Sequence, residues 1–555
     1  MRHKWKRMFL GLICVNLFSV FLMWTSLLES KCPCSHDESA DSAAGPASAP
    51  PKSRIRQLGR IKSPDASSLE DDIAGRNVAI QSPLDNIYNL PNTLLTLVFR
   101  EFEPFEHDLI ETVRSFHTVF PRMPIVVFAD GVPYPPIRFP ADEFGLNVSV
   151  VSLAKDPSLP ANATRLSSYI KTDMVMFAPD SVRMTQPAIV TTMVKHVYKH
   201  PGDMVAVRVA GEKRHCLQLD VNLKEWTLVY RKAAKKAESR CDAFAERHLL
   251  LAKSSLVLGL SDPMLRPFPQ ALHIQTALRG AKASTDDGGR IHIIDDYVAQ
   301  NGRTLFTTSH NRDKLRAATA ARQARLYEEF GIKKVHLPGG EVEWHGCDRS
   351  TPRCFATVVD ETPDYLYRGR WTPPCCLENL RRTARHVFAI LERCKVRYWL
   401  EGGSLLGAAR NHDIIPWDYD VDVGVYAEDV EGCEWLRNAR RQSIVDADGF
   451  VWEKAVEGDF FRVQYSRANR VHVDIFPFRA KDGRIMTKDT WFPTHPQDCE
   501  FPERFLKPLT TILFVGVFAS APNNITEFLE FKFGKGVLKK PQYPNPALLA
   551  YPKMR

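Results

Sequence analysis

Three aspartates alternate with other residues between positions 414 and 425 and offer oxygen ligands for a metal ion: Asp418, Asp420 and Asp422. On a β-strand, side chains at i and i+2 point to the same face, while the intervening valines face the core. Neighbouring aspartates then lie about 6.6 Å apart along the strand, so one ion suits a pair better than all three. We expect Asp420 and Asp422 to be that pair, because Asp418 closely follows Pro416 and is expected in the preceding loop.

A further carboxylate, Asp474, lies in a second alternating segment, Val-His-Val-Asp-Ile-Phe at 471–476. If the two segments form neighbouring strands, three like charges face one another, which is costly unless a cation neutralises them. Carboxylate-only ligation favours Mg²⁺ or Mn²⁺ over zinc. The set therefore predicts metal-assisted transfer of a phosphorylated group, with Asp420, Asp422, Asp474 and Asp418 as candidate catalytic residues.

A glycine-containing segment, Glu-Gly-Gly-Ser-Leu-Leu-Gly-Ala-Ala-Arg at 401–410, precedes the aspartates. We predict a turn at Gly402 and Gly403, a helix N-cap at Ser404 and then a helix. Glycines let a phosphate approach the backbone, and the unpaired N–H groups of a helix N-terminus bind anions. Arg410 is predicted to add its guanidinium to this phosphate site from the first helical turns.

Two further residues are candidates for substrate contact. Trp417 could form a wall of a nucleotide pocket, although a tryptophan after proline is as often part of the packing. His495, in Thr-His-Pro, is a weaker candidate, because a histidine in such a sequence more often lies in a surface loop.

Regular elements flank the glycine segment and hold it in place. Apolar residues at helical spacing from Leu377 to Leu391 predict an amphipathic helix, and the apolar run 396–400 predicts a short strand before the glycines. A glycine turn, paired aspartates on a strand and a third carboxylate on a neighbouring strand are typical of the nucleotidyltransferase fold. We therefore predict a catalytic α+β domain of that type at 341–555.

A separate domain precedes it, since 555 residues are too many for one core. Apolar runs at 94–99, 124–128 and 148–153 alternate with a helical segment at 107–119, which predicts an α/β stem domain at 93–340 with a mostly parallel sheet. Its cysteines, Cys216 and Cys241, are expected to form a disulfide.

The first 92 residues indicate membrane attachment. Residues 1–7 include four lysines and arginines, and residues 8–28 are uncharged and span roughly 31 Å as a helix, about one hydrocarbon core. We predict a cytoplasmic tail at 1–7, a transmembrane anchor at 8–28 and a flexible stalk at 29–92; a cleaved signal peptide is the alternative. Glycosylation sequons at Asn147, Asn162 and Asn524 fit a lumenal location.

Four cysteines lie just before the predicted catalytic helix: Cys347, Cys354, Cys375 and Cys376. Two disulfides are the default in an oxidising lumen. The adjacent pair could instead take part in a closed Cys₄ zinc site, although the spacing differs from the common Cys-x₂-Cys form. The residues alone leave these two alternatives even.

The segment EGGSLLGAARNHDIIPWDYDVDVGV resembles the LicD family of phosphocholine and sugar-phosphate transferases. Members usually have Trp-Asp-Asp-Asp where this chain has Trp417-Asp418-Tyr419-Asp420, so the middle carboxylate is lost while the i, i+2 pair is intact. Over nearly the whole chain, the anchor, stem, cysteines and tail (QYPNPALL) resemble the ribitol-phosphate transferases of this family.

This closer resemblance implies a single-pass type II Golgi membrane enzyme. The enzyme would move ribitol 5-phosphate from CDP-ribitol to a phosphorylated O-mannosyl glycan of α-dystroglycan, with Mg²⁺ or Mn²⁺ as cofactor. The resemblance also implies a structural zinc in the 347–376 cysteine loop, a homo-oligomer beside related Golgi transferases, and no nucleic-acid partner.

Two other functions remain as alternatives. A phosphocholine or other sugar-phosphate transferase would use the same machinery. A non-catalytic glycan-binding scaffold is disfavoured, because Gly403 occurs together with Asp420, Asp422 and Asp474.

Overall fold

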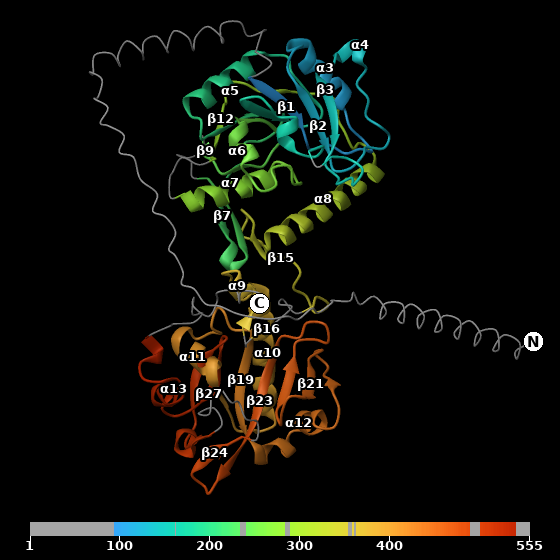
Figure 1. Cartoon of the computed structure of the whole chain (residues 1–555). Coiled ribbons are helices and arrows are strands. Elements are labelled where there is room, and N and C mark those ends of the chain that lie inside the picture. Colours follow the sequence, from blue (N-terminus) through green and yellow to red (C-terminus); the bar gives the residue numbers. More distant parts are fainter. Residues whose placement is uncertain are drawn as a thin grey trace, which may run out of the picture. The chain divides into compact units, whose positions relative to one another are not determined.

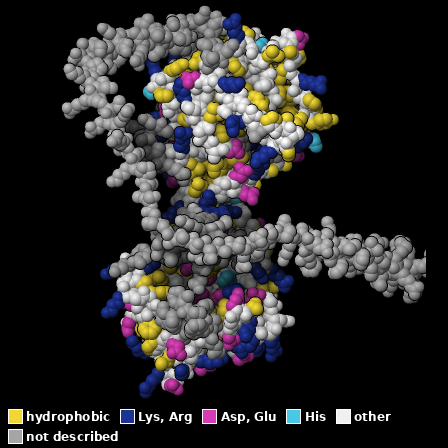
Figure 2. Space-filling model, in the orientation of Figure 1, with side chains coloured by type: hydrophobic (Ala, Val, Ile, Leu, Met, Phe, Trp, Pro, Cys, Tyr) yellow, Lys and Arg dark blue, Asp and Glu magenta, His cyan; other side chains and the backbone are white. Residues whose placement is uncertain are grey.

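The computed structural model describes residues 94–539 apart from 161, 234–239, 284–288, 353–357, 360–361 and 489–499. The predicted tail, anchor and stalk lie outside these residues. No helix within the described part is long and apolar enough to cross a membrane. Charged side chains of both signs are interspersed over the face shown in Figure 2.

The N-terminal part is an α/β domain whose main sheet has eight strands in the order β3-β2-β1-β4-β11-β6-β12-β9 (Figure 1). Strands β1 to β4 pair in parallel, as predicted, whereas β11 runs antiparallel to both of its neighbours, β4 and β6. The strands are β1 (Leu95–Phe99), β2 (Ile125–Ala129), β3 (Val148–Ser152), β4 (Met174–Ala178), β6 (Met204–Arg208), β9 (Arg240–Cys241), β11 (His248–Lys253) and β12 (Ile291–Ile293).

Both faces of this sheet are covered. Side chains alternate along each strand, so Leu97 packs with α3 (Leu109–Val119) and α5 (Ala188–Lys199), while Val98 packs with α6 (Ser254–Leu258) and α7 (Gln270–Ala283) on the opposite face. The remaining elements of this part are α4 (Ala141–Phe144), β5 (Val182–Arg183), β7 (Cys216–Asn222), β8 (Thr227–Lys232), β10 (Ala243–Phe244), β13 (Gln300–Asn301), α8 (Ser309–Phe330), β14 (Lys334–His336) and β15 (Val342–Trp344).

The C-terminal part is an α+β domain with a mixed sheet in the order β18-β19-β23-β22-β21-β20, to which β24 and β25 are added beside β23. Strands β19 and β23 pair in parallel, and every other neighbouring pair along this path is antiparallel. The strands are β18 (Tyr398–Leu400), β19 (Asp420–Tyr426), β20 (Ile444–Val445), β21 (Val451–Lys454), β22 (Phe461–Gln464), β23 (His472–Lys481), β24 (Ile485–Thr487) and β25 (Glu500–Pro502).

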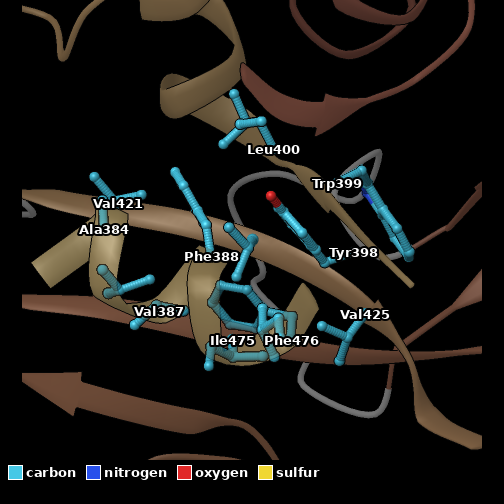
Figure 3. Packing of buried hydrophobic residues seen from close by; sticks show 14 of the residues in the cluster. Ala384, Val387, Phe388, Tyr398, Trp399, Leu400, Val421, Val425, Ile475 and Phe476 are labelled. Atoms are coloured by element: carbon cyan, nitrogen blue, oxygen red, sulfur yellow. The ribbon is translucent and has the colours of Figure 1, made fainter. Parts of the chain in front are cut away.

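Helix α10 (Pro374–Arg393) supplies the predicted amphipathic face. Ala384, Val387 and Phe388 point from it toward Val421 of β19 and Ile475 of β23 (Figure 3). The Phe388 ring stacks on Tyr398 with 5.4 Å between ring centroids. The remaining elements are β16 (Val358–Val359), β17 (Thr362–Pro363), α9 (Asp364–Tyr367), α11 (Gly402–Asn411), α12 (Glu434–Ala439), β26 (Thr510–Phe514), β27 (Val517–Ala521) and α13 (Ile525–Phe533).

Candidate active site

Strand β19 presents two aspartates on its open face. Asp420 and Asp422 are partly buried, whereas Val421, Val423 and Val425 of the other face are completely buried in the core. On the parallel neighbour β23, Asp474 is the register partner of Asp422. The alternation predicted from the sequence therefore brings three carboxylates to adjacent positions on one sheet face.

Asp418 joins this group from the loop that precedes β19. The backbone N–H of Tyr419 donates to its Oδ1 at 3.0 Å. Its Oδ2 lies 2.8 Å from the point where a Cβ on Gly403 would sit. The close approach of this carboxylate to the helix start therefore depends on glycine at 403.

Burial and mutual repulsion raise the pKa of these carboxyl groups. The pKa of Asp418 rises from 3.8 to about 7, mainly through burial and then through the charge of Asp422. Burial, followed by the other site aspartates, raises the pKa of Asp420 and of Asp422 well above its ordinary value. Such repulsion is relieved by a cation, and the all-carboxylate donor set fits Mg²⁺ or Mn²⁺ held by Asp420 and Asp422.

Among the described residues, one group places ligand atoms from three side chains within 4.8 Å of one another, and it lies elsewhere: His386, Asp446 and Asp448. Asp446 Oδ2 there accepts from His386 Nε2 at 2.7 Å and from Trp452 Nε1 at 2.8 Å. Those atoms are already satisfied, so we assign this group to packing. Within the described residues the site aspartates form no equally compact triple.

Arg462 is a site residue that sequence reasoning missed. From β22 it is the register partner of Asp474 and binds it with both arms of its fork, Nε to Oδ1 at 2.9 Å and Nη2 to Oδ2 at 3.0 Å. The same guanidinium also donates to Glu457 at 3.1 Å. An arginine on a strand between apolar residues is the signal that could have pointed to it.

The glycine segment differs from the prediction. Helix α11 begins at Gly402, so both glycines lie in its first turn and Ser404 is not the N-cap. Ser404 is buried, and its Oγ accepts a hydrogen bond of 2.8 Å from the backbone N–H of Asp422. Gly402 has a φ of +50°, a conformation that favours glycine. Ser404 therefore fastens the helix to the aspartate strand.

The predicted position of Arg410 in the first helical turns is wrong. Arg410 lies in the last turn of α11, about 12 Å along the helix axis from Gly402, and donates to the carbonyl of Val537. The anion-binding end of a helix is its N-terminus, so Arg410 is at the opposite end. Trp417 packs partly buried beside Trp371, with 6.1 Å between ring centroids, and His495 lies outside the described residues.

The cysteines form three described disulfides. The structure joins the expected pair Cys216 and Cys241, and it also joins Cys394 to Cys433. Cys347 is joined to Cys375, where the resemblance implied zinc, and Cys354 lies outside the described residues. Asn147 and Asn162 are both exposed, which glycosylation requires.

Comparison with known proteins covers both domains. Residues 85–338 match the fukutin-related protein stem domain, and residues 395–524 match the LicD/FKTN/FKRP nucleotidyltransferase domain. The human "Ribitol 5-phosphate transferase FKRP" is 48% identical over 457 residues, which are 82% of this chain and 89% of that protein. The mouse protein of the same name is also 48% identical, with coverage of 82% and 90%.

A bacterial relative matches a much shorter stretch. "Lipopolysaccharide cholinephosphotransferase LicD" of Haemophilus influenzae is 44% identical over 46 residues, 8% of this chain and 17% of that protein. The stem match covers the strands of the first eight-stranded sheet, and the LicD-type match covers the strands of the mixed sheet that carries the aspartates. The chain therefore belongs to the fukutin-related protein family, with a family stem domain followed by a LicD-type nucleotidyltransferase domain.

Proposed function

We propose that this chain transfers ribitol 5-phosphate from CDP-ribitol to a phosphorylated O-mannosyl glycan of α-dystroglycan. The observation that carries the proposal is the cluster of Asp418, Asp420, Asp422 and Asp474 beside the first turn of α11. It occurs in a chain 48% identical over most of its length to proteins named ribitol 5-phosphate transferases.

Charge placement supports this chemistry. Asp420 and Asp422 would hold a divalent cation, which would neutralise the charge of the donor diphosphate. The first turn of α11 lies beside the same aspartates, and the free N–H groups of a helix N-terminus suit a phosphate oxygen. Asp474 keeps lone pairs beyond its two bonds with Arg462, so its carboxylate remains able to act as a third ligand.

The proposed transfer is an in-line displacement at phosphorus. The acceptor hydroxyl oxygen bonds to the phosphorus that carries ribitol, and the bond from that phosphorus to the oxygen of CMP breaks. CMP leaves, and the hydroxyl proton passes to a carboxylate of the site.

A donor panel tests the assignment. The full-length protein with Mg²⁺ and a phosphorylated O-mannosyl acceptor is expected to use CDP-ribitol with a kcat/KM at least ~100-fold above that for CDP-choline. Mass spectrometry should show the acceptor gaining one ribitol phosphate as CMP is released. Preference for CDP-choline would favour the phosphocholine transferase, the reaction named for the matched bacterial relative. Absence of transfer from every donor would favour the scaffold.

We also propose that the protein resides in the Golgi membrane as a type II protein. The support is the uncharged segment 8–28 that follows four lysines and arginines. A homo-oligomer and an association with related Golgi transferases belong to the same proposal.

We propose further that Cys347, Cys354, Cys375 and Cys376 hold a structural zinc. The proposal is supported by the 5.6 Å between the Cα atoms of Cys347 and Cys375, with Cys376 buried next in the chain; as thiolates, these three would be close enough to ligate one ion in place of the disulfide.

Elemental analysis of the purified full chain should then find close to one zinc per chain that resists removal with the exchangeable Mg²⁺. Cys375→Ser should lose the zinc, because a hydroxyl is a poor zinc ligand beside thiolates. Thiol counting is the control: four oxidised cysteines without zinc would instead establish the disulfides.

A further inference from the structure

A buried ion pair lies directly behind the glycine turn. Lys532 of α13 donates from Nζ to Oε2 of Glu401, and the two side chains are 0% and 5% exposed. Trp399 Nε1 donates to the other oxygen, Oε1, at 2.9 Å. The Lys532 ammonium also lies 5.3 Å from the ring centroid of Phe501 and 5.1 Å from that of Phe528. The Glu401 carboxylate is therefore held on both oxygens inside the core.

Glu401 connects this pair to the catalytic elements. Its backbone N–H donates to the carbonyl of Asp422 at 3.0 Å, and its carbonyl accepts from Leu405 in the first turn of α11 at 3.1 Å. Gly402, the next residue, carries the Cα hydrogen that faces Asp422 Oδ2. A shift of the Glu401 side chain therefore moves both the start of α11 and its contact with β19.

The C-terminal helix fixes α11 at its other end as well. Helices α11 and α13 lie side by side (Figure 1). Arg410, in the last turn of α11, donates to the carbonyl of Val537, just beyond α13. The ion pair at the start and the hydrogen bond at the end thus set the position of α11 from one segment, 525–539.

The Glu401–Lys532 ion pair also affects the electrostatics of the site. The Glu401 carboxylate is close enough to Asp422 to add to the repulsion on that group. Without Lys532 it would be a buried, unneutralised negative charge beside the place where an anionic donor binds. Lys532 is therefore placed both to orient the anion-binding turn and to cancel the charge behind it.

We infer that Lys532 is a positioning residue for donor binding, acting through Glu401 on the first turn of α11. The inference rests on the proposed function, because it places the donor phosphates at that turn. It assigns a role in the reaction to a helix that lies outside the matched LicD-type segment, 395–524.

The test compares three variants of the full-length protein: Lys532→Met, Lys532→Met with Glu401→Gln, and Lys454→Met. Lys532→Met should raise the KM for CDP-ribitol about tenfold or more and leave the KM for the acceptor unchanged. The double variant removes both charges while the glutamine still accepts from Trp399, so its donor KM should return to within about threefold of wild type. Lys454, in a half-exposed pair with Asp459, is the matched control and should change neither constant.

Amide hydrogen exchange gives a readout that does not require turnover. Lys532→Met should speed exchange at residues 402–406 relative to residues 421–425, which belong to the core of β19. A lowered Tm with an unchanged donor KM and unchanged exchange at 402–406 would overturn the inference and leave a purely structural pair. Lack of transfer by the wild type with every donor would contradict the proposed function. Hydrogen exchange at residues 402–406 would still test whether Lys532 positions the first turn of α11.

Discussion

Replacing Asp420 with asparagine is expected to lower kcat about a thousandfold or more while the fold is retained. A thousandfold corresponds to about 4 kcal/mol, the scale of charge stabilisation that a metal supplies to a phosphoryl group. Asparagine keeps the shape of aspartate but offers the metal one neutral oxygen in place of a carboxylate. Turnover by mass spectrometry and Mg²⁺ affinity by calorimetry should fall together. Asp448→Asn, at a side chain that is 72% exposed, is the control for the chemical change alone.

The same variant has an expected effect on stability in metal-free buffer. Burial and repulsion raise the pKa of the site aspartates, so between pH 3.8 and about 7 the native state binds more protons than the unfolded state. The free energy of unfolding should therefore fall as pH rises through that window, and added Mg²⁺ should restore it. Asp420→Asn removes one of the repelling charges and should make the free energy of unfolding depend less on pH.

Turnover of Asp420→Asn equal to that of the wild type in Mg²⁺ would contradict the assignment of Asp420 as a metal ligand.

The catalytic face was predictable because it depends on short-range patterns. A period of two at 420–425 and again at 471–476 determines which side chains face the core, and the structure pairs these strands with Asp422 opposite Asp474. Helix α10 was predictable from the sequence in the same way, since its buried residues recur every three or four positions. The stem strands were readable from short continuous apolar runs, because strands covered on both faces are apolar throughout.

The errors in the glycine segment come from where the helix begins. Serine is a common N-cap, and the sequence offered no reason to place the N-cap three residues earlier, at Glu401, with the helix beginning at Gly402. Once the helix starts there, Ser404 becomes buried and accepts from the backbone N–H of Asp422. Arg410 falls in the last turn because the helix ends at Asn411, which the sequence did not indicate.

The missed residues depend on partners that no local pattern reveals. Arg462 meets Asp474 only because β22 and β23 pair in one particular register. Lys532 and Glu401 are 131 positions apart, and their pairing requires α13 to pack against α11. Arg462 and Lys532 are charged residues between apolar neighbours, a pattern that indicates a buried partner without identifying it.

Replacing Gly403 with alanine is expected to lower kcat without lowering the stability of the fold. The new methyl group would lie 2.8 Å from Asp418 Oδ2, closer than such atoms pack, so the carboxylate must move. Its movement strains the hydrogen bond that Oδ1 accepts from the N–H of Tyr419. A displacement on the order of 1 Å in a catalytic group commonly costs about a hundredfold in rate, so kcat should fall by about that factor.

The stability of Gly403→Ala should equal or exceed that of the wild type. Gly403 has no left-handed φ and lies in the first turn of α11, where alanine is a better helix former than glycine by up to about 1 kcal/mol. We therefore expect a Tm at or above that of the wild type together with the loss of turnover. Gly432→Ala is the matched control, because a Cβ there meets nothing within 4 Å and should change neither quantity. Full activity of Gly403→Ala would show that transfer does not require Asp418 in its observed position, whereas a large drop in Tm would show that the helix start, rather than the carboxylate, has been disturbed.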